Sequence, residues 1–162
     1  MPTPQKIELG EQIADFSVNC TNAKAFQLSD YRGKNLVLYF YPRDSTPGCT
    51  LEGQDFSARL AKFAKHNTLV FGISRDSIAR HQRFKDTQGF DFELLSDEQE
   101  ELCQLFDVMK DKNMYGKKVR GIERSTFLLD GQGVLRHAWR KVKVEGHAAE
   151  VLQVVSTLVA KA

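Results

Sequence analysis

Two continuously apolar segments constrain the fold of this chain more than any other feature of its sequence. Residues 35–41 read NLVLYFY and residues 68–74 read TLVFGIS. Apolar runs of this length indicate central strands that are covered on both faces. The order strand, helix, strand is predicted because the segment between them carries apolar side chains at helical spacing before His66 and Asn67. These side chains are Leu51, Phe56, Leu60 and Phe63.

The middle of the chain is predicted to hold two more helices and a short strand. Residues 77–88 have helical spacing and end at Gly89, and ELLS at 93–96 indicates the strand. Ser96 and Gln99 have the spacing of a capping box, which predicts the start of the third helix. The buried stripe of this helix is formed by Leu102, Phe106 and Met109.

The last third of the chain is predicted to be a loop, a hairpin and a helix. We expect the loop at residues 110–123, and the hairpin from strands at 125–130 and 134–141 around the turn GQG. An amphipathic helix then closes the chain. Alternating strands and helices predict one α/β domain over residues 1–162, with a central mixed β-sheet flanked by helices.

The charge of the chain is nearly balanced, with 23 Lys and Arg against 21 Asp and Glu and a formal net charge of +2. The basic residues are scattered, which argues against a nucleic-acid partner. The first residues, MPTPQKIELGEQ, have neither the basic flank nor the apolar core of a secretion signal, and no apolar run is long enough to cross a bilayer. We therefore expect a cytoplasmic protein without a membrane partner.

Neither the cysteines nor the histidines have the spacing of a metal site. Cys20, Cys49 and Cys103 are far apart and form no CxxC pair, which argues against a disulfide scaffold and against a cluster of zinc ligands. At least one thiol should be free, and we expect no metal and no cofactor. The four histidines also stand alone and are expected to be solvated or capping residues: His66, His81, His137 and His147.

Cys49 is placed where a buried strand gives way to the first turn of a helix. Pro42 ends the strand because it has no amide hydrogen to donate, and Thr46 and Pro47 suit the N-cap and the first position of a helix. The positive end of a helix favours the thiolate, which is the nucleophilic form of cysteine. Gly48 allows backbone amides to approach a bound oxygen closely. The alternative is that Cys49 is simply a small buried apolar residue.

The residues around Cys49 resemble those of a known family. The spacing Pro42-x-x-x-Thr46-x-x-Cys49 is similar to the peroxiredoxin signature, and YPRDSTPGCTLEG resembles the branch called peroxiredoxin Q or bacterioferritin comigratory protein. The likeness extends to DFSV and FQLSDYRGK near the start and to MYGKKVRGIERSTFLLD late in the chain. It implies a thioredoxin-like fold with an N-terminal β-hairpin extension. It also implies a thiol peroxidase that reduces hydrogen peroxide and organic hydroperoxides, with thioredoxin or another thiol as the reductant.

The resemblance implies a role for each residue that matches the family's site. Cys49 is then the peroxidatic cysteine, Thr46 the hydroxyl that orients the peroxide, and Pro42 the residue that shields the thiolate from water. Arg124 matches the site arginine, and attack on an O–O bond needs such a cation because negative charge develops on the departing oxygen. Glu52 is expected to bind this arginine. On the sequence alone, Arg124 could be a surface residue and Glu52 an ordinary first-turn glutamate.

The usual positions of a second, resolving thiol are not cysteines in this chain. Many members of the Q branch have a cysteine five residues after the peroxidatic one, where this chain has Gln54, and others have it where this chain has Lys85. The resemblance therefore implies a 1-Cys mechanism, in which the sulfenate of Cys49 waits for an external thiol. The alternative is an atypical 2-Cys cycle with Cys103, whose other interpretation is a packing residue. Cys20 is expected in or beside an N-terminal hairpin, as a structural residue.

Two other classes of function are compatible with the predicted fold. A thioredoxin-type disulfide oxidoreductase requires two thiols at short spacing, and CxxC is absent. A thioredoxin-fold binding module without catalysis would tolerate any residue at position 49. The long C-terminal extension of many dimeric members of the superfamily does not follow the predicted last helix, so we expect a monomer.

Overall fold

Strands dominate the centre of the computed structural model, which describes residues 7–160. In chain order they are β1 (Ser17–Cys20), β2 (Lys24–Gln27), β3 (Asn35–Phe40), β4 (Thr68–Ser74), β5 (Leu94–Ser96), β6 (Met109–Met114), β7 (Lys117–Ile122), β8 (Ser125–Leu129) and β9 (Leu135–Trp139). Seven of these described strands form one mixed sheet in the order β2-β1-β5-β4-β3-β8-β9. The other two, β6 and β7, form a separate hairpin.

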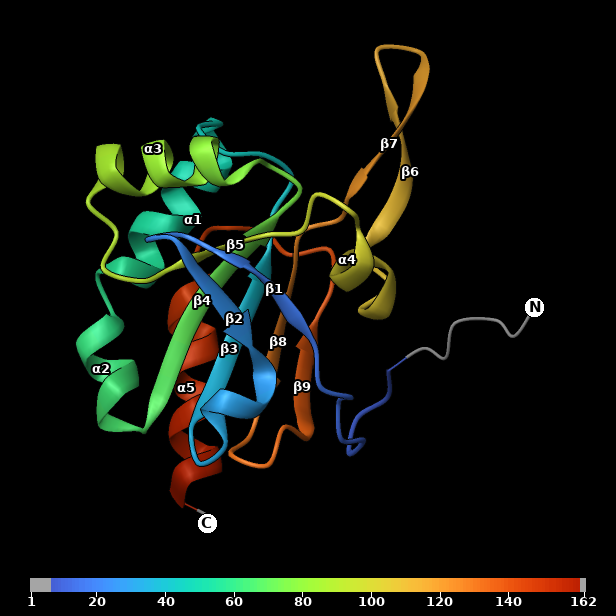
Figure 1. Cartoon of the computed structure of the whole chain (residues 1–162). Helices are drawn as coiled ribbons and strands as arrows, with labels where there is room; N and C mark the ends of the chain where they lie inside the picture. Colours follow the sequence, from blue (N-terminus) through green and yellow to red (C-terminus); the bar gives the residue numbers. More distant parts are fainter. Residues whose placement is uncertain (1–6, 161–162) are drawn as a thin grey trace.

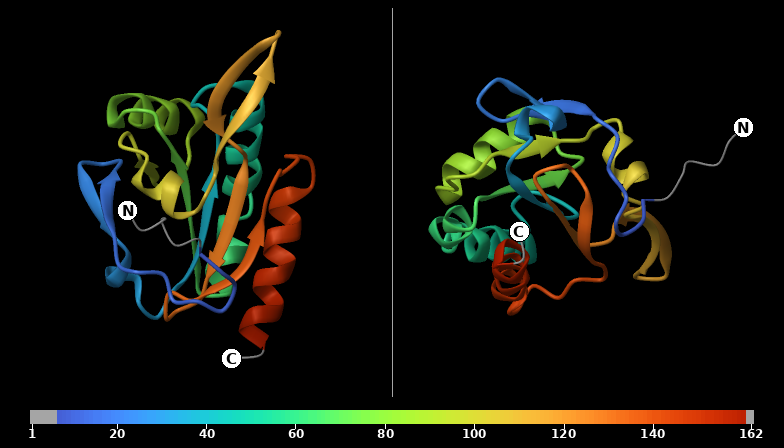
Figure 2. Two further views of the ribbon diagram at one scale, coloured as in Figure 1. Left: turned by 90° about the vertical axis from the view of Figure 1, so that its right-hand side faces the viewer. Right: turned by 90° about the horizontal axis from the view of Figure 1, so that it is seen from below.

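Helices cover both faces of the main sheet. They are η1 (Leu28–Tyr31), α1 (Pro47–Ser57), α2 (Leu60–Lys65), α3 (Ile78–Gln88), α4 (Glu101–Leu105) and α5 (His147–Ala160). Side chains of α1, α2, α3 and α5 pack on one face, here called the α1 side. Those of α4 and η1 pack on the other, the α4 side. Figures 1 and 2 show α5 and α4 on opposite sides of the strands. The predicted mixed sheet flanked by helices is confirmed.

The centre of the sheet is formed by β3 and β4, as the sequence predicts. The two strands are parallel, with Asn35 opposite Thr68 at one end. Residues 36–40 are at most 2% exposed because alternate side chains enter the cores on the two sides of the sheet. Since the strands are parallel, their carboxyl ends meet at one edge of the sheet, and the loop to α1 begins there.

The expected N-terminal hairpin is formed by β1 and β2, with Val18 opposite Phe26. β1 also pairs with β5, where Asn19 lies opposite Ser96. The hairpin therefore extends the main sheet. Cys20 is the last residue of β1 and is 4% exposed, so it lies in the hairpin as predicted.

The single helix expected between the two central strands is in fact two helices. α1 and α2 are separated by two residues, and one of them, Arg59, has φ −111° and ψ 5° and so leaves the helical region. Leu51 was expected on the buried face but is 47% exposed, whereas Phe56 and Phe63 are buried. The break brings these two phenylalanine rings into one core, where their centroids are 6.0 Å apart.

The predicted start of the third helix is also wrong. Ser96 is the last residue of β5, and its hydroxyl donates to the carbonyl of Asp76 (2.6 Å) instead of forming a capping box with Gln99. The helix, α4, has only five residues. The carboxylate of Asp97 accepts hydrogen bonds from two amides of α4, those of Leu102 and Cys103 (3.1 and 2.7 Å). The two oxygens of one carboxylate thus satisfy two free amides of α4, one each.

Residues 110–123 were expected to be a loop, but they form most of an antiparallel hairpin that projects from the body of the molecule (Figure 1). Met109, expected on the third helix, is the first residue of β6 and lies opposite Ile122. Tyr115 and Gly116 make the turn, and both have a positive φ (53° and 79°), which is the geometry of a type I′ turn. The usual sequence signal for this turn is Asn-Gly or Asp-Gly. Because this chain has Tyr-Gly, the sequence did not predict the turn.

The end of the chain agrees with the sequence. β8 and β9 form the predicted hairpin, with Thr126 opposite Trp139. The last helix, α5, follows Gly146, whose φ of 75° suits a glycine. Among the helices of residues 7–160, none combines the length and the apolar character that a membrane span requires.

Candidate active site

The loop that leaves β3 places Cys49 at the positive end of α1. Tyr41 still donates its amide to the carbonyl of Ile73 in β4 (3.0 Å), and Pro42, which has no amide hydrogen, comes next. α1 begins at Pro47, so Cys49 is its third residue, and Cys49 is 2% exposed. The sulfur therefore lies in the field of the free amides of the first turn, which favours negative charge.

Thr46 precedes α1 as predicted, but its side chain does not cap the helix. Its backbone is extended (φ −86°, ψ 154°), and its hydroxyl donates to the carbonyl of Arg43 (2.9 Å). Ser45, between them, has a positive φ of 65°, so the chain turns sharply there. The hydroxyl hydrogen of Thr46 is used within the loop, and its oxygen keeps lone pairs that can accept a hydrogen bond from a bound molecule.

Arg124 brings Cys49 and Glu52 together. It lies between β7 and β8, and its guanidinium donates from Nη1 to Oε1 of Glu52 (2.6 Å) and from Nη2 to Sγ of Cys49 (3.5 Å). Glu52 follows Cys49 by three residues on the same helix, so the two side chains share a face of α1. The contact between Glu52 and Arg124 is the one that the resemblance implies.

Burial determines much of the charge balance in this cluster. Glu52 is 1% exposed, and burial raises the pKa of its carboxyl to about 7, although the charge and the hydrogen bond of Arg124 act to lower it. Burial acts to lower the pKa of Arg124, but the negative charges of Glu52 and Cys49 outweigh it and raise that pKa. The guanidinium therefore stays a cation beside the sulfur, while the carboxyl is poised to take up a proton near neutral pH.

Gly48 makes room for this cation. A β-carbon at position 48 would lie 3.2 Å from Nη2 of Arg124, the atom that donates to Cys49. This is closer than an ordinary van der Waals contact, so a side chain would press on the guanidinium. The sequence indicated a close approach of backbone amides at Gly48 but not this use of the glycine.

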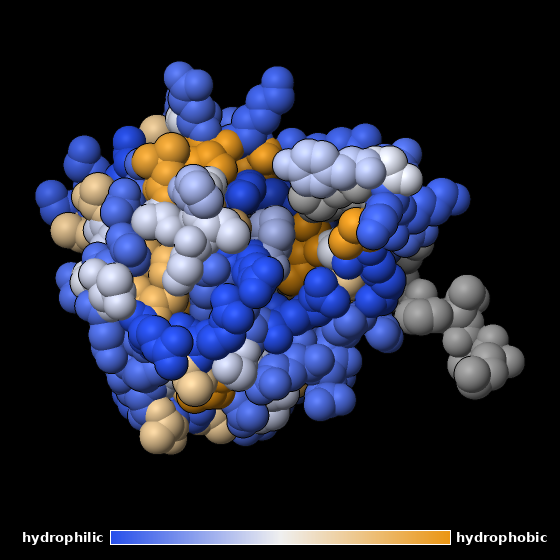
Figure 3. Space-filling model, turned by 90° about the horizontal axis from the view of Figure 1, so that it is seen from above, coloured by the Kyte–Doolittle hydropathy of each residue, from blue (hydrophilic) through white to orange (hydrophobic). Residues whose placement is uncertain are grey.

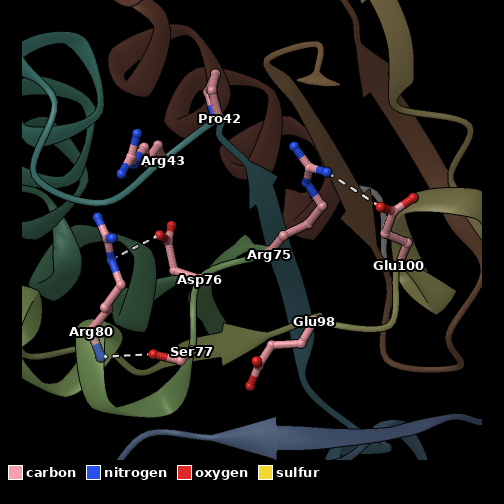
Figure 4. Close-up of a pocket in the computed structure, with 8 residues that line it drawn as sticks. All are labelled: Pro42, Arg43, Arg75, Asp76, Ser77, Arg80, Glu98 and Glu100. Atoms are coloured by element: carbon pink, nitrogen blue, oxygen red, sulfur yellow. Dashed lines mark hydrogen bonds and ion pairs between the residues drawn. The ribbon is translucent and has the colours of Figure 1, made fainter. Parts of the chain in front are cut away.

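A polar cavity of about 530 Å³ borders the loop at Pro42 and Arg43 (Figure 4). Its other lining residues are Arg75, Asp76, Ser77, Arg80, Glu98 and Glu100. Arg75 pairs with Glu100 (3.3 Å) and Arg80 with Asp76 (3.2 Å), so its lining contains paired opposite charges. Seen from above in Figure 3, the surface carries many hydrophilic side chains around smaller apolar areas. The shielding role of Pro42, which is half-buried at this cavity, stays a prediction.

The other two thiols lie on the α4 side of the sheet. Cys20 and Cys103 belong to the core there, whereas Cys49 belongs to the core on the α1 side. All three are free. Burial raises the pKa of Cys20 to about 11 and that of Cys103 still further. A disulfide between Cys49 and Cys103 would therefore require a large rearrangement, since the α-carbons must come within about 7 Å.

Two histidines that were expected to be solvated or capping residues are buried instead. His147 is 4% exposed, its Nε2 lies 2.8 Å from Oγ1 of Thr126, and burial lowers its pKa to about 4. His81 is completely buried, and its Nδ1 lies 2.6 Å from the carboxylate of Asp44. Asp44, Asp76 and His81 offer possible ligand atoms within 4.8 Å of one another, but each is already hydrogen-bonded inside the protein. Sequence reasoning missed both networks because their members are far apart in the chain.

Comparison with known proteins identifies the family. The profile of the AhpC/TSA family matches residues 9–138, a range that includes Thr46, Cys49 and Arg124. The chain belongs to the AhpC/TSA family. Among members with curated descriptions, peroxiredoxin Bcp of Xanthomonas campestris is 51% identical over 150 residues, which cover 93% of this chain and 94% of that protein. Peroxiredoxin Bcp of Bacillus subtilis is 45% identical over 152 residues, covering 94% and 97%.

Solved structures of AhpC/TSA proteins have the same fold. The bacterioferritin comigratory protein of Xanthomonas campestris, described for its alkyl peroxide reduction activity, matches with a TM-score of 0.85 and 50% identity, covering 89% of this chain and 92% of that chain. A cysteine-to-serine mutant of PrxQ from Xylella fastidiosa matches with a TM-score of 0.90 and 43% identity, covering 94% and 98%. The thioredoxin-like fold and the resemblance to peroxiredoxin Q are therefore confirmed.

Proposed function

We propose that this chain is a thiol-specific peroxidase that reduces hydrogen peroxide and organic hydroperoxides to water and alcohols, with Cys49 as the peroxidatic cysteine. The observation that carries the proposal is the position of Sγ, in the first turn of α1 and 3.5 Å from Nη2 of Arg124. Membership of the AhpC/TSA family and the alkyl peroxide reduction described for the Xanthomonas relative support the same activity.

The reaction transfers one oxygen atom to Cys49. The thiolate attacks the terminal oxygen of the hydroperoxide, and an S–O bond forms as the O–O bond breaks. The departing oxygen takes up a proton from solvent and leaves as water or an alcohol. Cys49 is oxidised by two electrons to the sulfenic acid, and the peroxide is reduced by two. Arg124 stabilises the negative charge that develops on the departing oxygen, and the hydroxyl of Thr46 orients the peroxide for in-line attack.

An external thiol then returns Cys49 to its reduced state in a 1-Cys mechanism, with thioredoxin or a related thiol as the reductant. The reductant's thiolate attacks the sulfenic sulfur and releases water, and a second thiol breaks the resulting mixed disulfide. Cys103 is the alternative partner, and the sheet between it and Cys49 argues against it. Because Cys49 is 2% exposed, a reductant of protein size reaches its sulfur only after the first turn of α1 has moved.

Two competing functions are a thioredoxin-type disulfide oxidoreductase and a binding module without catalysis. The first needs a second thiol close to Cys49, and the other two cysteines lie across the sheet. A binding module without catalysis does not need a guanidinium that donates to a sulfur at a helix N-terminus, as Arg124 does here. Both observations favour the peroxidase.

Peroxide consumption by the purified chain tests the proposal. In the presence of a thiol reductant, the parent protein should turn over hydrogen peroxide, whereas Cys49→Ser should not. Cys103→Ser is the matched control and should retain most of the activity if the mechanism is 1-Cys. Turnover by Cys49→Ser at the parent rate would reject Cys49 as the peroxidatic residue.

Intact-mass analysis after one equivalent of peroxide separates the two mechanisms. With a sulfenate trap present, the 1-Cys mechanism should give a single adduct that maps to Cys49. Loss of two hydrogens that maps to Cys49 with Cys103, or to Cys49 with Cys20, would instead establish a 2-Cys cycle.

We also propose that the protein is cytoplasmic and that it is a monomer. The three free cysteines suit a reducing compartment. Large exposed apolar side chains among the described residues lie on several different segments, and only Tyr115 and Val119 share one, the β6–β7 hairpin, which argues against a stable apolar interface: Leu9, Leu51, Leu69, Tyr115 and Val119. Cell fractionation and sedimentation at micromolar concentration test these two statements. A stable dimer in sedimentation would contradict the second.

A further inference from the structure

A second group of polar side chains, separate from the Arg124 cluster, holds the loop between β3 and α1. Asp44, in this loop, is 2% exposed. Its Oδ1 accepts the hydroxyl of Tyr41 (2.5 Å), and its Oδ2 lies 2.6 Å from Nδ1 of His81 on α3. Nε2 of His81 lies 2.8 Å from the carbonyl oxygen of Leu95 in β5. His81 and Tyr41 are completely buried, so they connect the loop to the core of the protein.

The partners of His81 determine where its hydrogens lie. A carbonyl oxygen only accepts hydrogen bonds, so Nε2 carries a hydrogen and donates it to Leu95. Nδ1 and the carboxylate of Asp44 are 2.6 Å apart, a distance that requires a hydrogen between the two atoms. The other carboxylate oxygen already accepts the hydroxyl of Tyr41. Every polar side-chain atom of Asp44 and His81 thus has a hydrogen-bond partner. These bonds fix the orientation of both side chains.

The backbone of Asp44 is held as well. Its amide donates to Oδ2 of Asp76 (2.8 Å), whose other oxygen pairs with Arg80 (3.2 Å; Figure 4). The next residue, Ser45, has a left-handed backbone (φ 65°), which is unfavourable for a residue with a side chain. The loop is therefore fixed at Asp44, directly before the strained turn that leads to Thr46.

We propose that His81 is a positioning residue for peroxide reduction: by holding Asp44, it keeps the turn at Ser45 closed and so presents Thr46 and the first turn of α1 to the peroxide. The proposal rests on the roles proposed above for Thr46 and Cys49. His81 does not contact the sulfur and acts through the loop. A displacement of about 1 Å can slow a positioned reaction by about 100-fold. Loss of the connection should therefore slow the attack on peroxide while the nucleophile remains.

Two substitutions at position 81 separate the two hydrogen bonds of the imidazole. The side-chain amide of His81→Asn comes close to the place of Nδ1 and can donate to Asp44, whereas that of His81→Gln comes close to Nε2 and can donate to Leu95. The rate constant for oxidation of Cys49 by hydrogen peroxide is measured in single turnover on samples that circular dichroism shows to be folded. We expect a loss of at least about tenfold for His81→Gln and of less than about threefold for His81→Asn.

Controls distinguish positioning from stability. Alkylation of Cys49 by iodoacetamide, located by mass spectrometry, should continue in both variants because the nucleophile is still present. His66→Asn is the matched control, since His66 precedes β4 and lies at the opposite edge of the sheet from the loop. A purely structural role would lower the denaturation midpoint of both variants and leave the rate per folded molecule unchanged. Parent-like rates in both His81→Gln and His81→Asn would overturn the proposal.

If His81→Gln does not fold, Asp44→Asn breaks the same hydrogen bond from its other side. The side-chain oxygen of this variant can still accept the hydroxyl of Tyr41, whereas its amide nitrogen cannot accept a hydrogen from Nδ1 of His81, so we expect the oxidation rate to fall by at least about tenfold. A rate equal to that of the parent would overturn the positioning role. The rate constant of the parent protein itself tests the proposed peroxidase function, so the two proposals can fail separately.

Discussion

The buried carboxyl of Glu52 predicts how the stability of this protein depends on pH. Its pKa is about 7 in the folded chain, against an ordinary value of 4.5. A carboxyl with a raised pKa contributes fully to stability below the unfolded pKa, and this contribution is lost as the pH rises through the folded pKa. A tenfold change in proton affinity corresponds to about 1.4 kcal/mol, so complete ionisation of Glu52 costs the folded state about 3 kcal/mol.

Glu52→Gln removes this titration and keeps an oxygen that can accept a hydrogen bond from Arg124. The comparison is made in a Cys49→Ser background, so that the titration of the thiol does not contribute. Urea denaturation gives the free energy of unfolding at several pH values between about 5 and 8. Relative to Glu52→Gln, the protein with Glu52 should lose about 2 to 3 kcal/mol over this range.

The sign of the result is as informative as its size. Parallel pH profiles for the two proteins would refute the argument that burial outweighs the attraction of Arg124. A profile in which the protein with Glu52 gains stability as the pH rises would show that the ion pair lowers the pKa of the carboxyl below its ordinary value.

Two further substitutions test the role of the guanidinium of Arg124 and the packing of α1 against Phe90. Arg124→Lys keeps a positive charge but loses the planar fork that reaches both Glu52 and Cys49, so single-turnover oxidation of Cys49 should slow by about 100-fold; an unchanged rate would place the arginine outside the reaction. Gly53→Ala would place a β-carbon 2.4 Å from Cζ of the buried Phe90, so urea denaturation should show a loss of about 1 to 3 kcal/mol despite the better helix propensity of alanine. Gly121→Ala, which meets nothing within 4 Å, is the control, and a gain in stability at Gly53→Ala would contradict the prediction.

The elements that the sequence predicts well are those whose signals are local. β3 and β4 are continuous apolar runs, and α3 has a clear start and end. The hydroxyl of Ser77 accepts the amide of Arg80 (3.3 Å), and Gly89 ends the helix with a φ of 68°. The start of α4 and the hairpin of β6 and β7 were wrong for a physical reason. Asp97 caps α4 from outside the expected spacing, and Tyr115 occupies a turn position that usually holds Asn or Asp.

The residues of the candidate site also fall into two groups, those that local sequence signals predict and those that depend on contacts between distant segments. The positions of Thr46 and Cys49 follow from the local order of strand, turn and helix. Arg124 reaches Cys49 from 75 residues away, so only the family resemblance connected the two. Asp44 and His81 are 37 residues apart, and their hydrogen bond depends on how α3 packs against the loop. No local sequence pattern predicts such a contact, so the sequence alone gave no reason to connect these two residues.

The main sheet separates Cys49 from the other two thiols of the domain. Cys20 and Cys103 lie behind it, in apolar surroundings that keep the hydrogens on their sulfurs. Gln54 and Lys85, at the positions where the family resemblance places a second thiol, are on α1 and α3, and a hydrogen bond of 2.9 Å from Gln54 joins these two helices. The helical layer around Cys49 therefore holds neither of the other two thiols. For a disulfide with Cys49, the side of the sheet on which a second thiol lies is thus a stronger geometric constraint than its distance along the chain.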